Sequence, residues 1–201
     1  MATAQFLKSA VWPEDYPDSS RPEIALVGRS NAGKSTLLNA MTGGAKVAKI
    51  SSTPGKTRLI NFFDVGEHYR LVDLPGYGYA ARQADERRLW AQMTDKYFAQ
   101  RENLAGIILI CDMRRQWSED ENLVEELSRS RKIPFLCCLT KIDKLSRAES
   151  LKLFNTWIKT SEHPQEIFFP VSALKNDGVR PLEDYIFKAW IKSYSPKAKQ
   201  E

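Results

Sequence analysis

The sequence lacks any long hydrophobic run. No segment approaches the roughly 18 uninterrupted apolar residues of a membrane-spanning helix. Residues 1–17 contain no apolar core of the kind that a secretory signal carries. These absences argue against an integral membrane protein and against export, so we expect a cytoplasmic protein.

Cysteine and histidine are also scarce, with three and two residues. Cys111, Cys137 and Cys138 lie in apolar runs without the spacing of a metal site, so we expect reduced core residues. We expect His68 and His163 to lie at the surface. The sequence also has no large excess of one charge, since 30 basic and 25 acidic residues give a formal net charge of +5. This basic excess suits RNA, but a soluble enzyme without such a partner has it about as often.

What is present is an alternation of strand-like and helical segments over 201 residues, a length that favours one domain. We expect an N-terminal arm at 1–22, the folded domain at 23–194 and a polar tail at 195–201. The expected fold is α/β in three layers, with a six-stranded, mostly parallel sheet and one antiparallel edge strand. The expected strands are 23–27, 59–65, 68–74, 105–111, 133–139 and 167–171. The expected helices are 34–41, 85–100, 118–131, 146–160 and 182–193.

A glycine-rich motif follows the first expected strand. Residues 28–35, GRSNAGKS, match G-x-x-x-x-G-K-[ST] at every fixed position and lead into a helix. The backbone N–H groups of such a loop and the positive end of the helix bind phosphate oxygens. Lys34 would bridge the β- and γ-phosphates, and Ser35 would bind Mg²⁺. The predicted phosphate-binding residues are Gly28, Arg29, Ser30, Asn31, Ala32, Gly33, Lys34, Ser35 and Thr36.

A second motif, DLPG, ends the third apolar run. Asp73 is the carboxylate expected at this strand of a P-loop enzyme, where it holds Mg²⁺ directly or through water. The N–H of Gly76 is the natural contact for a γ-phosphate. The predicted nucleotide-binding residues of this motif are Asp73, Leu74, Pro75 and Gly76.

The motif TKID, after the fifth expected strand, separates GTP binding from ATP binding. A carboxylate at Asp143 accepts hydrogen bonds from both the N1–H and the exocyclic amine of guanine, a donor pair that adenine lacks. The stem of Lys141 would lie along the base. The segment SAL would offer a backbone N–H to the guanine oxygen. The predicted base-binding residues are Thr140, Lys141, Ile142, Asp143, Ser172, Ala173 and Leu174.

The motifs GRSNAGKS, DLPG, TKID and SAL, in this order, resemble the translation-factor-related class of P-loop GTPases over residues 23–193. Within this class, SSTPGKTRLINFF and DLPGYGYA resemble the EngB family of bacterial ribosome-assembly GTPases. The resemblance implies a monomeric GTP-hydrolysing switch that uses Mg²⁺. Its implied partner is a ribosomal subunit or pre-ribosomal particle, through rRNA and ribosomal protein, with a link to cell division and septation.

The resemblance also assigns roles near residue 57. Thr57 would be the switch I threonine, which binds Mg²⁺ and the γ-phosphate, and Thr53 is the alternative. With Lys34 and Gly76, Thr57 would complete the catalytic set, for which no general base is identifiable. The residues expected to line the nucleotide here are Gly55, Lys56, Thr57, Arg58 and Leu59. The expected metal ligands are Ser35, Thr57 and Asp73.

Three positions bear on how far the resemblance holds. Thr140 stands where many GTPases carry Asn, which leaves base specificity to Asp143. Tyr77 follows DLPG where Ras-like enzymes carry a water-orienting Gln, and a phenol cannot replace an amide, so we expect slow intrinsic turnover. Asn31 resembles the cation-ligating asparagine of potassium-activated members and suggests K⁺. The alternative for Asn31 is an Asx-type bond to its own backbone.

Two other functions fit the motifs less well. A metabolic P-loop kinase or phosphotransferase would need a lid or an acceptor-substrate domain, neither of which is visible. A GTP-dependent RNA-binding module with negligible hydrolysis shares every motif. Five arginines are candidates for RNA contacts, with a solvated helix face as the alternative for most of them: Arg82, Arg87, Arg88, Arg114 and Arg115.

Overall fold

The computed structural model describes residues 4–43, 59–77, 84–161 and 163–195. This part of the chain forms a seven-stranded sheet in the order β1-β3-β4-β2-β5-β6-β7. The strands are β1 (Ala4–Ala10), β2 (Glu23–Gly28), β3 (Ile60–Val65), β4 (Tyr69–Asp73), β5 (Leu104–Asp112), β6 (Phe135–Thr140) and β7 (Phe168–Pro170). The helices are α1 (Lys34–Met41), α2 (Ala84–Gln100), α3 (Glu119–Arg131), α4 (Arg147–Ser161) and α5 (Val179–Ile186).

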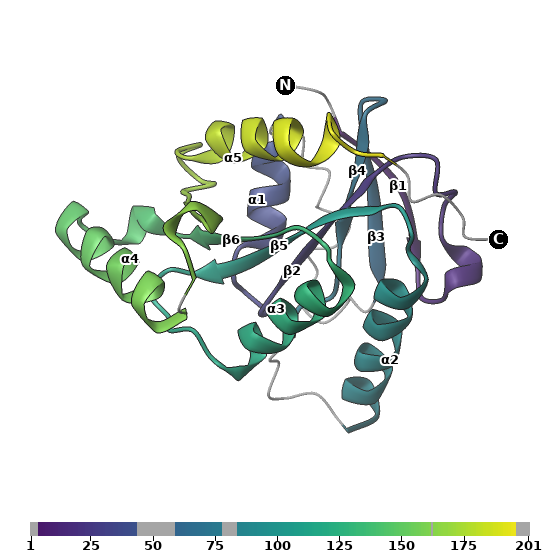
Figure 1. The fold of residues 1–201 in the computed structure, drawn as a ribbon, viewed down its shortest axis with the longest axis horizontal. Helices are drawn as coiled ribbons and strands as arrows, with labels where there is room; N and C mark the ends of the chain where they lie inside the picture. The colour runs from purple at the N-terminus through teal and green to yellow at the C-terminus, as the bar shows by residue number, and fades with distance from the viewer. Residues whose placement is uncertain (1–3, 44–58, 78–83, 162, 196–201) are drawn as a thin grey trace.

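Helices cover both faces of the sheet, as the α/β pattern predicts (Figure 1). On one face α1 and α5 pack on the sheet through Leu37, Leu38 and Leu182. On the other face α2, α3 and α4 bury a second apolar cluster, which includes Tyr97 and Trp157. The continuous apolar run of β5 is buried on both faces, which explains its lack of alternation. The three-layer fold is therefore confirmed.

The sheet has one strand more than predicted. Ala4–Ala10 pairs antiparallel with β3, and β3 in turn pairs antiparallel with β4. The strand that runs against the others is thus β3, as expected from the hairpin, but β1 takes the edge position outside it. Phe6 packs on Phe63 with ring centroids 5.6 Å apart, and the Ser9 hydroxyl donates to the Asn61 side chain. The sequence AQFLKSA gave little indication of this strand, because its apolar residues do not alternate regularly.

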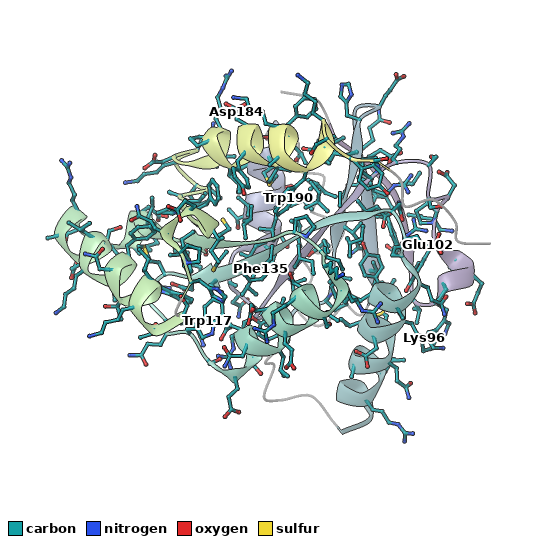
Figure 2. The ribbon with its side chains drawn as sticks, viewed as in Figure 1. Lys96, Glu102, Trp117, Phe135, Asp184 and Trp190 are labelled. Carbon is teal, nitrogen blue, oxygen red and sulfur yellow. The ribbon has the colours of Figure 1, made fainter. Side chains whose placement is uncertain are left out.

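The last helix also differs from its predicted bounds. It begins at Val179, three residues before the predicted start, and continues into a π-helical turn, Phe187–Ile191. Within that turn Trp190 lies between the helix and the sheet (Figure 2). A Cβ atom on Gly106 of β5 would lie only 2.2 Å from the Trp190 ring, so this position requires glycine.

Two predictions about side chains and one about membranes can be compared with the described residues. All three cysteines are free and buried, as expected. His68 is exposed, whereas His163 is partly buried and packs on Trp117. Among the described helices, none is both long and apolar enough to cross a bilayer.

Candidate nucleotide-binding site

The parallel strands of the sheet bring the predicted motifs to one edge. β2 is parallel to β4 and β5, and β6 is parallel to β5 and β7, so their carboxyl ends meet there. The glycine-rich loop follows β2, DLPG follows β4, TKID follows β6 and SAL follows β7. Carboxyl ends of strands at a change in strand order are the usual ligand sites of open α/β sheets.

The loop between β2 and α1 has the geometry of a phosphate-binding loop. Gly33 precedes α1 with φ 101°, a left-handed conformation that favours glycine. A Cβ atom on Gly28 would lie 2.4 Å from the carbonyl oxygen of Ile110 on β5, so a larger residue would push the loop away. Lys34 opens α1, whose first turn directs its N–H groups toward the loop. The backbone is therefore arranged to surround an anion.

Lys34 and Asp73 come together next to this loop. The Lys34 Nζ lies 3.6 Å from Asp73 Oδ1, and the Asp73 side chain is 2% exposed. Burial raises the pKa of the Asp73 carboxyl above its usual range, while the ammonium of Lys34 acts in the opposite direction. Asp73 Oδ1 is buried, and the described residues offer it no hydrogen-bond partner. An oxygen of this kind fits a cation or its bound water, with the Ser35 hydroxyl one residue from Lys34 as the second ligand.

The DLPG turn is joined to β2 by a backbone hydrogen bond and packs against the phosphate loop. The Leu74 N–H donates to the Leu26 carbonyl at 3.2 Å, so the β2–β4 pairing continues past Asp73. A Cβ atom on Gly76 would lie 3.0 Å from the backbone nitrogen of Ser30. The described structure therefore places Gly76 directly against the loop.

Thr140 joins the base-binding segment to the phosphate loop. Its hydroxyl oxygen lies 2.5 Å from the Ala32 carbonyl oxygen and 3.0 Å from that of Cys111. The residue is 2% exposed. A hydroxyl has one proton, so it donates to one carbonyl at a time. Threonine thus supplies a direct link between β6 and the loop, although a longer asparagine is more usual here.

Lys141 makes a second link to the same loop. Its Nζ donates to the Asn31 carbonyl at 2.6 Å and lies 3.0 Å from Asp112 Oδ2. Burial alone would raise the pKa of Asp112, but hydrogen bonds from Arg114 and Lys141 hold it well below the usual range. Asp112 is therefore ionised, and its ion pair with Lys141 fixes the side chain that we expect to lie along the base.

Asp143 is held by a serine from the neighbouring strand end. The Ser172 hydroxyl donates to Asp143 Oδ1 at 2.9 Å, and Lys144 lies 3.8 Å from Oδ2. The Asp143 side chain is 6% exposed. Ala173 is half-buried and Leu174 is exposed. The carboxylate that would read guanine is thus oriented before any base is bound, which reduces the cost of recognition.

Sequence reasoning missed two residues that the structure places at this edge. Asp112 ends the apolar run of β5. A carboxylate at the end of a buried strand is typical of a ligand site, so the sequence could have indicated this residue. Glu121 lies in the first turn of α3 and accepts a hydrogen bond from the Tyr77 hydroxyl. No hydrogen bond from the Asn31 side chain to its own backbone is found within the described segments, and Asn31 is exposed with φ 65°.

Several predicted site residues lie outside the described part of the chain. They are Thr53, Gly55, Lys56, Thr57 and Arg58. Arg82, a candidate for RNA contact, also lies outside the described residues. Leu59 is described, and it lies half-buried just before β3.

Comparisons with known proteins agree with this geometry. Residues 23–141 match the family model described as a 50S ribosome-binding GTPase. The chain is 50% identical over 190 residues to the probable GTP-binding protein EngB of Bdellovibrio bacteriovorus, covering 94% of each chain. It is 43% identical to the probable GTP-binding protein EngB of Pelobacter propionicus, covering 87% of this chain and 88% of that one.

Solved structures share the fold. A probable GTP-binding protein EngB superposes with a TM-score of 0.68 at 24% identity, over 83% of this chain and 97% of that one. Era, solved with MgGDPNP and nucleotides 1506–1542 of 16S ribosomal RNA, superposes with a TM-score of 0.64 at 26% identity. That match covers 90% of this chain and 60% of Era.

Proposed function

Because the chain belongs to the EngB family of P-loop GTPases, and therefore binds and hydrolyses GTP, we propose that it is a switch that assists the assembly of a ribosomal subunit. The main support for the proposal is that the motifs expected of this family lie together in the structure as one site. The phosphate loop, the DLPG turn and the base segment are joined by direct contacts. The family assignment also favours a GTPase over the metabolic kinase.

The chain's own residues divide the work on GTP. The N–H groups of the loop and Lys34 hold the β- and γ-phosphates, and Gly76 offers its N–H to the γ-phosphate. Ser35, Asp73 and Thr57 would hold Mg²⁺, which when bound neutralises charge on the phosphate oxygens. The buried Asp73 oxygen, which the described residues leave without a hydrogen bond and which faces only the Lys34 ammonium, supports this ligand set. Asp143, oriented by Ser172, selects guanine.

Slow intrinsic hydrolysis follows from the position of Tyr77. Its hydroxyl bonds to Glu121 on α3, so it does not orient a water molecule at the γ-phosphate in this conformation. A cation bound near Asn31 or an arginine from a partner would then supply the missing charge. K⁺ is our proposal for that cation, because Asn31 resembles the cation-ligating asparagine of potassium-activated members of this class, and its side chain is exposed at the loop.

The ribosomal partner is supported by relatives and by charge. Era, which shares the fold, is bound to 16S ribosomal RNA in its crystal structure. In this chain, exposed basic residues follow the ends of β5, β6 and β7, at the edge that carries the nucleotide site. They are Arg114, Arg115, Lys144, Arg147 and Lys175. Basic groups in this position suit contacts to rRNA phosphates.

The test is co-sedimentation with separated ribosomal subunits in the presence of a GTP analogue, GDP or no nucleotide. We expect the GTP-analogue form to pellet with one subunit more than the GDP form, and binding to weaken as salt rises. Arg147→Glu should reduce pelleting. Lys159→Glu is a matched control because it lies on the same helix, about 18 Å along its axis. Equal pelleting in all nucleotide states, or an equal effect of both variants, would reject the proposal.

A further inference from the structure

The side chain of Tyr77 is buried against helix α3. The residue is 7% exposed, and its hydroxyl donates to Glu121 Oε1 at 2.8 Å. Glu121 is itself 2% exposed. Trp117, labelled in Figure 2, lies just ahead of this first turn of α3. A buried hydrogen bond to a carboxylate is among the stronger single contacts in a protein, so Tyr77 is firmly held.

Glu121 is in turn fixed by the start of its own helix. Its second oxygen, Oε2, accepts the backbone N–H of Ser118 at 2.9 Å and also the Ser118 hydroxyl. One residue earlier, Asp120 pairs with Arg29 of the phosphate loop at 3.3 Å. The first turn of α3 is therefore tied both to the phosphate loop and to the residue that follows DLPG.

The backbone of Tyr77 is also joined to the phosphate loop. Its N–H donates to the Gly28 carbonyl at 3.3 Å, and its carbonyl accepts the Ser30 N–H at 2.9 Å. Gly76, immediately before it, is packed against Ser30. Because Gly76 carries no side chain, its position depends on how its neighbours are held, and Tyr77 has both a backbone and a side-chain anchor.

From these contacts we propose that Tyr77 is a positioning residue for GTP hydrolysis. Through its hydrogen bond to Glu121 it holds the Gly76 N–H on the γ-phosphate side of the loop. The role requires no proton transfer by the phenol. Burial raises the pKa of the Tyr77 phenol well above its usual range, and Glu121 adds to the increase, so the hydroxyl remains a donor.

The test is single-turnover GTP hydrolysis by Tyr77→Phe, with GDP affinity measured in parallel. The variant keeps the ring and loses only the hydroxyl. We expect the hydrolysis rate at saturating GTP to fall about tenfold or more, since a hydrogen bond to a carboxylate contributes more than a neutral one. GDP affinity should be unchanged, because GDP lacks the phosphate that Gly76 contacts. A fall in rate without a fall in GDP affinity identifies an interaction used in hydrolysis.

A second variant and a control separate positioning from general stability. Glu121→Leu removes the acceptor and should lower the rate similarly, and the double variant Tyr77→Phe/Glu121→Leu should be no slower than the slower single variant. Ser128→Ala is the control, because Ser128 is also buried, and its hydroxyl donates to the Ile133 carbonyl at 2.7 Å near the far end of α3. It should lower the melting temperature without changing the rate.

Three results would overturn the proposal. They are an unchanged or higher rate in Tyr77→Phe, additive losses in the double variant, or an equal loss in Ser128→Ala. If Tyr77→Phe does not fold, Glu121→Leu against Ser128→Ala decides the question by the same rate measurement.

Discussion

Replacing Thr140 by valine should weaken both the fold and nucleotide binding. The hydroxyl oxygen lies 2.5 Å from the Ala32 carbonyl oxygen in a site that is 2% exposed, so water cannot readily replace it. Losing one neutral hydrogen bond costs about 1 kcal/mol, and leaving a buried carbonyl unpaired adds about 1 kcal/mol or more. The extra apolar surface of valine offsets part of this. We expect the free energy of unfolding to fall by about 1–2 kcal/mol.

The same change should reduce affinity for GDP and GTP to an equal extent. Thr140 connects β6 to the phosphate loop, so without the bond the loop must be ordered by the nucleotide itself. If about half of this loss of free energy appears in nucleotide binding, the dissociation constant rises about two- to fivefold. The preference for GTP over ATP should remain, because Asp143 and its partner Ser172 are untouched.

Two measurements and two matched variants check this reasoning. Urea unfolding gives the stability, and direct titration with GDP, GTP and ATP gives the affinities. Thr140→Ser keeps the hydroxyl and should retain GDP affinity, while Thr160→Val makes the same substitution on the exposed end of α4. An unchanged GDP dissociation constant in Thr140→Val, with stability lowered as predicted, would refute the role of this link in binding.

Two further predictions concern base choice and the cation. Asp143→Asn should weaken GTP binding and favour XTP, whose 2-oxo group accepts from an amide; equal GTP and ATP affinity in the unmutated protein would contradict the assignment of Asp143. K⁺ should stimulate hydrolysis relative to Na⁺ and Li⁺ at constant ionic strength, and Asn31→Ala should abolish the effect. Equal turnover in the three salts, with and without a ribosomal particle, would exclude the cation and direct attention to an arginine from a partner.

Much of the site was predictable because its motifs are continuous in sequence. The loop 28–35 needs glycines for backbone geometry and a lysine at a fixed place, so its pattern is informative by itself. The same holds for Asp73 and Asp143, each of which directly follows or lies near the end of an apolar run. The alternation of strands and helices fixed the layers for the same reason.

The residues that orient these motifs were not predictable in the same way. Asp112 acts on Lys141 only because β5 and β6 are neighbours, with Asp112 paired in register with Thr140. Ser172 was predicted for its backbone, yet its hydroxyl holds Asp143. Such partners depend on strand order and register, which local periodicity does not give. β1 was missed for a related reason. Its apolar residues do not alternate regularly, and the strand forms because it pairs with β3, which is distant in the sequence.

The contacts of the phosphate loop divide into two groups with different consequences for a switch. Thr140 and Lys141 connect it to the base segment, which both GDP and GTP occupy, so these links cannot distinguish the two nucleotides. Asp73 and Tyr77 connect it to the DLPG turn, which we expect to face the γ-phosphate. A ligand shifts a conformational equilibrium only by its difference in affinity for the two states. Only the second group can carry that difference, and within the described residues its side-chain connection beyond the turn runs from Tyr77 to Glu121 on α3. In this structure the first turn of α3 is thus joined both to the phosphate loop, through Asp120 and Arg29, and to the residue after DLPG.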